Sequence, residues 1–406
     1  MLTLTRRSLV CLAFLVLIGV EALAADPARA PRALLRSGVR LLDEGSLRGL
    51  AAGGESAVLE FERIPPSLRG VRRGHVLVAG VDERAPGGLL RRVTHVRKRA
   101  GRLIVETEPA TLEDVFWFGR AQARVSLAPE TGRLVAHVEG VRAADASAQA
   151  WSPGRLELEL ADVVLYDLDG DPGSIGDQVR VRGSVGLEPT FDVDLDVAWG
   201  RIRRFAFTNA TRLDTTLELD GRVTVSLDSQ LTIATLQLPP VTFMVGPIPV
   251  VLVPVLELNV GVSGSVSAGL RTSVSAGVSI AAGVSFENGL WSGSSTLPDG
   301  PEDLDLVWRA PELWAEAQAE ARVGPRLTVL LYGVAGPYAS AFGYSAVEAS
   351  LPARSWSLAF GLRGEAGVAV AAPPPGVQAR YPVASFDRRW PIAAGTFEAE
   401  AVGVAP

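Results

Sequence analysis

The chain has 406 residues, 48% hydrophobic and 21% charged, which excludes a disordered protein and leaves room for more than one core. Its single cysteine excludes an internal disulfide and a cysteine metal cluster, and its formal net charge of −6 favours solubility rather than binding to nucleic acid. The 42 glycines and 27 prolines favour many turns and few helices, and the 6% aromatic content makes stacking platforms for sugars or bases scarce.

The N-terminal residues have the composition of a secretory signal. A short basic segment precedes an apolar run over residues 8–20, and Ala22 and Ala24 are the small residues that a signal peptidase needs. A membrane anchor is the alternative, but a spanning helix needs about 20 apolar residues and this run is shorter. We therefore expect residues 1–24 to be a signal peptide for the general secretory route. The mature protein would lack Cys11 and lie outside the cell, at the cell surface or in the periplasm.

The next segments predict a linker and then a small folded unit. Residues 25–57 have the composition of a linker or docking segment with one short helix. Residues 58–119 contain short runs rich in Val, Leu and Ile, separated by turn residues such as Ala100-Gly101. Thr111 can cap a helical turn whose first residues are acidic. We expect a small β module closed by that turn.

The remainder predicts long antiparallel sheets. In residues 120–238 and 239–406 apolar and polar residues alternate, and turn signals recur at roughly 8–12 residues, as in a sandwich or an elongated sheet. Asn288-Gly289 predicts a hairpin turn, and residues 315–321 fit a strand better than a helix. The fold class is therefore all-β, with a small N-terminal β module followed by a large antiparallel β-sandwich or elongated sheet body. The second region is expected to continue the first.

One apolar segment interrupts the alternation. Residues 241–258 are almost continuously apolar and contain Pro247, Pro249 and Pro254, which no helix tolerates and which cost a central strand its ladder bonds. We expect an extended segment that crosses between sheets. It either belongs to the core or forms the wall of a cavity for an apolar ligand.

Several blocks resemble a known family. GHVLVAG with GLLRRVTHV and ETEPATLEDV, VGPIPVVLVPVLELNVGVSG with FENGLW, and LYGVAGPY are similar to blocks of a family of secreted, β-rich bacterial proteins for which no activity is known. The chain departs from the family at His75, where an aspartate usually stands. The resemblance implies an extracellular β-rich protein and offers no catalytic residue.

An acidic loop is the best chemical constellation. Asp167, Asp169, Asp171 and Asp177 lie in the glycine-containing segment YDLDGDPGSIGDQ, and clustered carboxylates can wrap Ca²⁺, the one cofactor that we consider. Pro172 stands where a helix–loop–helix calcium loop requires glycine, which excludes that loop type. The alternative is a solvated acidic turn.

A second acidic group alternates along a strand. Asp192, Asp194 and Asp196 point to one face, which favours a solvent-facing strand; a glycosidase carboxylate pair is the alternative. The three histidines, His75 and two others, are expected at surface or edge positions of strands and lack metal spacing.

The small module carries most of the clustered basic residues. They form a candidate contact with an anionic surface, or with the acidic body of the same chain. The residues are Arg72, Arg73, Arg91, Arg92, Arg97, Lys98 and Arg99.

The sequence thus favours a secreted or cell-surface protein without enzymatic activity. We expect a structural, adhesive or binding role toward a protein or glycan of the bacterial envelope or extracellular space. Three alternatives stay open: a carrier of lipid between the sheets, an outer-membrane β-barrel and a glycan hydrolase. The sequence leaves the oligomeric state open.

Overall fold

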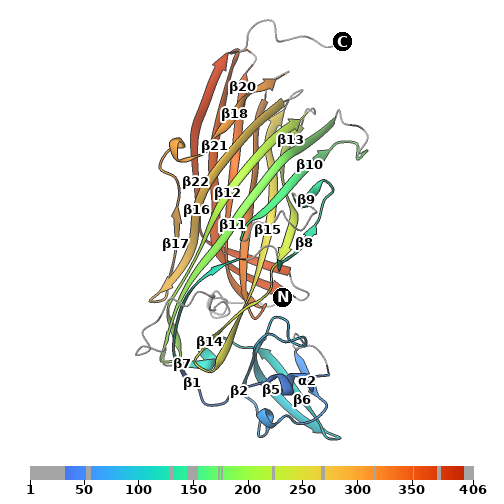
Figure 1. Cartoon of the computed structure of the whole chain (residues 1–406), viewed down its shortest axis with the longest axis vertical. Coiled ribbons are helices and arrows are strands. Elements are labelled where there is room, and N and C mark those ends of the chain that lie inside the picture. The colour runs from blue at the N-terminus through green and yellow to red at the C-terminus, as the bar shows by residue number, and fades with distance from the viewer. Residues whose placement is uncertain are drawn as a thin grey trace.

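The computed structural model confirms an all-β fold with three sheets (Figure 1). It describes residues 33–51, 56–127, 131–143, 154–171, 174, 177–221, 225–266, 270–313, 317–350, 352–372 and 376–396, so the predicted signal at 1–24 lies outside the described residues. No helix in these ranges has both the length and the apolar character needed to cross a membrane.

The small sheet has five strands and is mixed. Its order is β2 (Val39–Leu41), β4 (Val76–Ala79), β5 (Leu89–Arg99), β6 (Arg102–Pro109) and β3 (Val58–Phe61), with β2 parallel to β4. The helix α2 (Glu44–Arg48) and a 3₁₀ turn at Pro66–Leu68 cover one face. Residues 25–57, expected to be a linker or docking segment with one short helix, therefore contribute the strand β2 and the short helix α2 to this module.

The first large sheet is antiparallel, and all its strands except β1 follow α3 (Leu112–Val115) in the chain. Its main path is β1 (Leu34–Leu35), β7 (Phe116–Ser126), β11 (Gln178–Ala198), β12 (Arg201–Gly221), β16 (Leu270–Glu287) and β17 (Leu290–Thr296). The strands β10 (Leu156–Asp167) and β9 (Val141–Ala143) extend it beside β11, and β18 (Val307–Leu313) pairs with β16. A 3₁₀ turn at Pro301–Asp303 lies between β17 and β18.

The second large sheet is also antiparallel. Its order is β22 (Gly376–Thr396), β21 (Ser355–Ala372), β20 (Ala335–Ser350), β19 (Ala317–Leu331), β15 (Ile248–Val266), β13 (Val225–Gln237) and β8 (Arg133–Ala136), and β14 (Val241–Val245) pairs with β15. Residues before and after position 238 therefore build both large sheets. The strand expected around residues 315–321 is confirmed from Ala317 onward.

Strict alternation buries one face of each large sheet against the other. On β12, Phe205, Phe207 and Leu213 are buried, whereas Arg204 and Arg212, each next to one of them in sequence, are exposed. Side chains from both sheets join in one continuous apolar cluster. Since a strand rises about 3.3 Å per residue, the 21-residue strands β11 and β12 each extend about 70 Å. The body is accordingly elongated along the strands (Figure 1).

We expected the proline-rich segment to cross between sheets, and this prediction is wrong. It forms the hairpin of β14 and β15 within the second large sheet. Pro254 lies between the last β13 partner, Gln237 opposite Val255, and the first β14 partner, Val241 opposite Leu252. One side of β15 has no paired strand at that point, which is where a strand tolerates proline.

The small module packs on the turn end of the second large sheet. The two apolar faces of its β4 differ in their partners, because Val76 and Val78 join the large core whereas Leu77 and Ala79 join the module's own core. Gly88 has a φ of +72°, and a Cβ there would lie 2.6 Å from Val251 Cγ2 and 2.8 Å from Tyr332 Cδ1. The junction therefore leaves no room for a side chain at this glycine.

Candidate functional site

The acidic loop joins β10 to β11 and brings three of its four predicted aspartates together. One carboxylate oxygen from each of Asp167, Asp169 and Asp177 lies within 4.8 Å of the others. The Asp167 Oδ1 atom accepts the N–H of Gly170 at 3.0 Å, and Asp169 Oδ1 accepts the N–H of Asp171 at 2.8 Å. Asp171 is not a member of the carboxylate group. The loop can hold a hard cation through these oxygens, but it is also closed by its own hydrogen bonds.

The three alternating aspartates of β11 face arginines on the neighbouring strands. Asp192 lies opposite Arg124 and accepts its Nε–H at 2.7 Å, and Asp196 lies opposite Arg120 and accepts its Nη2–H at 2.6 Å. These bonds raise the pKa of both arginines above its ordinary value. Asp194 accepts a hydrogen bond from Gln122 and lies 3.3 Å from Arg204. Each carboxylate is thus engaged in a cross-strand ladder of hydrogen bonds and ion pairs.

The predicted basic residues of the small module divide into paired and unpaired groups. Arg92 forms ion pairs with Glu108 and Asp114, Arg97 pairs with Glu106 at 2.9 Å, and Arg91 donates to the Thr107 hydroxyl at 2.6 Å. Among the seven predicted residues, four are exposed and form no ion pair with a carboxylate of the described part of the chain, and two of these, Lys98 and Arg99, lie at the tip of the β5–β6 hairpin. They are Arg72, Arg73, Lys98 and Arg99.

One histidine is buried, which corrects the expectation of a surface position. His75 is 7% exposed and lies in a turn immediately before β4, and its Nε2 accepts the Nε–H of Arg72 at 3.2 Å. Burial lowers the pKa of His75, and the positive charges of Arg40 and Arg72 lower it further. The other two histidines, His95 and His137, are exposed.

The segment that we considered for an apolar cavity contributes to the central core. Phe243, Ile248, Val250, Leu252 and Leu256 are each at most 3% exposed, and all belong to the continuous cluster between the sheets.

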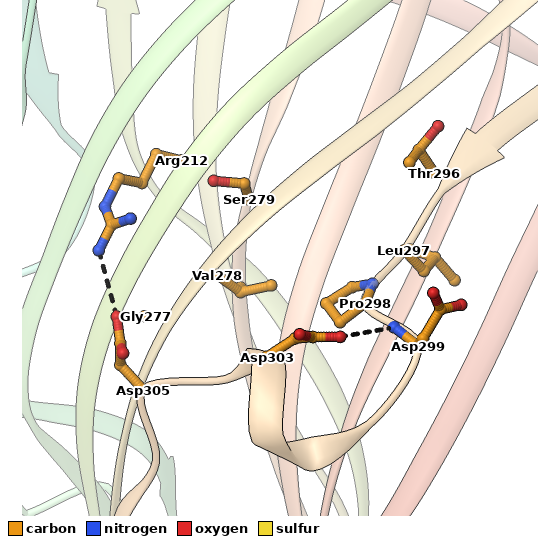
Figure 2. Close-up of a pocket in the computed structure, with 10 residues that line it drawn as sticks. All are labelled: Arg212, Gly277, Val278, Ser279, Thr296, Leu297, Pro298, Asp299, Asp303 and Asp305. Carbon is orange, nitrogen blue, oxygen red and sulfur yellow. Dashed lines mark hydrogen bonds and ion pairs between the residues drawn. The ribbon is translucent and has the colours of Figure 1, made fainter.

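A shallow pocket of about 300 Å³ opens on the outward side of the first large sheet (Figure 2). Arg212 of β12 reaches Asp305 at 3.4 Å, and Asp303 accepts the N–H of Asp299 at 3.1 Å. Ser279 is the only hydroxyl from β16 in the lining, and the lining contains no histidine or cysteine. The pocket therefore offers the charges of Arg212 and of three aspartates together with the hydroxyls of Ser279 and Thr296.

Two exposed tryptophans, Trp117 and Trp199, lie close together at the turn between β11 and β12. The ring of Trp199 lies 6.2 Å from that of Trp117 and 4.8 Å from that of Phe118, with interplanar angles of 87° and 67°. The guanidinium of Arg36 lies over the Trp117 ring at 5.3 Å, and Leu34 pairs with Phe118. We call Leu34, Arg36, Trp117, Phe118 and Trp199 the aromatic end. It belongs to the end of the body where β1 and β7 are labelled in Figure 1.

Backbone contacts hold the aromatic end in place. The Gly200 N–H donates to the Trp117 carbonyl at 2.9 Å, and Arg36 donates to the Gly200 carbonyl at 3.0 Å. The N–H of Ile202 donates to the Glu113 carboxylate of α3 at 2.8 Å. The turn is thus fixed from three neighbouring segments, while the Trp199 side chain remains 62% exposed.

The sequence analysis missed this group of residues. A Trp-Gly pair between two long alternating runs was the available signal, because a two-residue hairpin turn normally carries Asn-Gly or Asp-Gly. The clustering with Leu34 and Trp117 depends on the pairing of β1, β7 and β11, which one sequence does not reveal.

Comparison of the chain with protein families, with curated proteins and with solved structures finds no match. The resemblance to a secreted bacterial family therefore remains a prediction.

Proposed function

We propose that this is a secreted, non-enzymatic binding protein of the bacterial envelope or extracellular space, which engages its partner through the aromatic end. The exposure of Trp199 at a turn that neighbouring segments hold in place carries this proposal. Exposed tryptophan rings are enriched at binding surfaces because they supply a large contact area with few rotatable bonds.

The arrangement of charge supports the same choice of surface. Along β11 the outward carboxylates are compensated by arginines of the adjacent strands, as in the pairs of Asp192 with Arg124 and Asp196 with Arg120. Such a surface is well hydrated and offers little apolar area for a partner. Loops at the end of a β-sandwich commonly carry function, since the sheets position them rigidly.

The test is binding of the purified protein, produced without residues 1–24, to isolated envelopes of its own cells. We expect Trp199→Asn to reduce the bound fraction about tenfold or more, because the ring supplies the central contact area. Trp308→Asn is the matched control: Trp308 is 40% exposed but pairs with Val274, in the half of β16 away from the aromatic end. Equal binding by the wild type and Trp199→Asn would contradict the proposal.

A further inference from the structure

We propose that the aromatic end docks onto the surface of an anionic lipid membrane. This inference rests on the proposed function and names the class of its partner.

Two neighbouring hairpin tips present large apolar side chains at this end. Arg204 of β12 lies opposite Glu287 of β16, so the turn after Glu287 lies at the same end of the sheet as the turn that carries Trp199. Leu290 follows that second turn and is 76% exposed. Small ligands bind in concave sites, whereas protruding tips of this kind suit a flat, deformable surface.

The tryptophan is not required by the turn. Trp199 and Gly200 have φ values of +56° and +66°, and the adjacent turn reaches similar values, +53° and +86°, with Asn288 and Gly289. The left-handed region is strained for a bulky residue, whereas asparagine tolerates it. Trp199 therefore occupies a strained backbone position, and in the adjacent turn the equivalent position is held by asparagine. Strain at an exposed residue points to a role in binding.

The chemistry of the surrounding residues favours a membrane over a glycan. The rings of Trp117 and Trp199 are nearly perpendicular, so they do not form a flat platform on which a sugar can stack. Leu34 and Leu290 are exposed aliphatic side chains, which gain free energy in lipid but offer little to a polysaccharide. Tryptophan is enriched at the membrane–water interface, where its ring is apolar and its N–H remains hydrated.

Charge at the same turn favours an anionic surface. Arg201 and Arg203 lie at the start of β12, just after the Trp199-Gly200 turn, and are exposed, and within the described residues no carboxylate pairs with either of them. The Glu113 carboxylate accepts the Ile202 N–H, and the exposed Glu287 lies opposite Arg204 on the neighbouring strand. Each arginine near an anionic membrane adds electrostatic attraction, which decreases with salt.

The experiment is cosedimentation with phosphatidylcholine vesicles that contain about one third phosphatidylglycerol. We expect the wild type to bind these vesicles, to bind pure phosphatidylcholine more weakly, and to show a blue shift of tryptophan emission on binding. Trp199→Asn is expected to weaken binding by about tenfold or more. Its melting temperature should be unchanged or raised, because the substitution relieves the strain of the turn. Arg201→Gln with Arg203→Gln is expected to remove most of the salt dependence, and Trp308→Asn to bind like the wild type.

The outcomes separate this inference from the proposed function. If the wild type does not bind anionic vesicles, or if Trp199→Asn binds them equally well, the membrane inference is wrong. If Trp199→Asn nevertheless loses binding to whole envelopes, the proposed function stands with a glycan or protein partner. If it retains binding to envelopes, the proposed function fails as well.

Discussion

His75 shows how one buried ring links the small module to pH. Its Nε2 accepts a hydrogen bond from Arg72, so the neutral ring carries its proton on Nδ1, and protonation would place a second N–H against a guanidinium. Gly38 packs against the ring, since a Cβ at that glycine would lie 3.0 Å from His75 Cδ2. The site is therefore built around the uncharged imidazole.

The pKa of His75 predicts a loss of stability in acid. The folded-state pKa lies below the ordinary value of 6.5, so the unfolded chain binds the proton more readily. The contribution of neutral His75 to the folding stability is fully present above pH 6.5 and is lost as the pH falls through the lowered pKa of His75. We expect the melting temperature to fall between pH 7.5 and 5 by more in the wild type than in His75→Gln. Parallel pH profiles of the two proteins would contradict this assignment.

The acidic loop allows a test of the calcium hypothesis. If Asp167, Asp169 and Asp177 hold Ca²⁺, calcium should raise the melting temperature and EDTA should reverse the rise, because a ligand that binds the folded state stabilises it. Asp169→Asn preserves the acceptor for the Asp171 N–H but removes one charge, and it should abolish the response. An unchanged melting temperature with calcium and with EDTA means that the loop is a solvated acidic turn.

At this scale the sequence identifies groups but not their environments. The aspartates of the loop and of β11 were recognisable from spacing, whereas the partners of Asp192 and Asp196 lie on β7, about 70 residues away. His75 was assigned wrongly because its burial comes from Gly38 and Arg72, which approach it only in the folded module.

The strands of the second large sheet carry a more buried set of ion pairs than those of the first. Glu320 of β19 is 19% exposed and accepts hydrogen bonds from Arg363 at 3.0 Å and Arg322 at 3.4 Å. Arg363 lies over the Tyr344 ring at 5.0 Å, and the Tyr344 hydroxyl donates to Asp387 at 2.8 Å. Burial raises the pKa of Tyr344, and the carboxylate of Asp387 raises it further.

A glycine makes this arrangement possible. A Cβ at Gly361 of β21 would lie 2.1 Å from Tyr344 Cζ, so the ring lies flat on the glycine of the neighbouring strand. Tyr344 lies within the part of β20, Ala335 to Val347, in which every residue is buried.

Removing one carboxylate charge from the ion pairs of each large sheet should have different effects on the stability of the protein. Glu320→Gln leaves Arg322, which is 12% exposed, without its most buried carboxylate partner, and we expect a loss of about 2 kcal/mol in the free energy of unfolding. Asp192→Asn affects a pair that water reaches freely, so no measurable change is expected. Denaturant titration of both variants checks this, and equal losses would show that burial does not determine how much each ion pair contributes to stability.

Strands and tight turns were the most predictable elements. The Asn288-Gly289 hairpin is confirmed because both residues adopt the positive φ that its type requires. The capped turn at Thr111 is confirmed as α3, where Asp114 accepts the Thr111 N–H at 2.9 Å. The proline-rich segment was predicted wrongly, because tolerance for Pro254 depends on where the neighbouring strands β13 and β14 end.

The whole molecule consists of a small core fused to a large one. The β4 strand contributes alternate residues to both, and the turn that contains Tyr332 packs against Gly87 and Gly88 of the module. The buried Tyr332 hydroxyl donates to the Pro249 carbonyl at 2.5 Å. The GHVLVAG, GLLRRVTHV, VGPIPVVLV and LYGVAGPY blocks thus meet at one junction, and their sequence separation concealed this.

The junction predicts coupled unfolding that a single methyl group should disrupt. Gly88→Ala adds a Cβ that overlaps Val251 and Tyr332 in a left-handed backbone, whereas Gly101→Ala meets no atom within 4 Å at a similar φ of +81°. We expect calorimetry to show one transition for the wild type and Gly101→Ala, and an earlier, separate transition of the module for Gly88→Ala. Identical calorimetric profiles of the two variants would mean that the junction accommodates the added methyl group without loss of coupling.

The fold class followed from the sequence, but the distribution of strands between sheets did not. Alternation specifies which residues of a strand are buried, but it does not determine which other strand pairs with that strand. Strands before and after position 238 mix in both sheets, because β13 pairs with β15 and β12 pairs with β16.

The length and direction of β22 determine how the molecule bears mechanical tension. The described chain starts at the end where β1 lies and finishes with β22 at the opposite end (Figure 1). A pull applied between these two ends is directed along the strands, so the hydrogen bonds that join β22 to β21 from Gly376 to Thr396 are loaded in shear and resist together. A protein held to a surface at one end would transmit force through its whole length before any strand peels away.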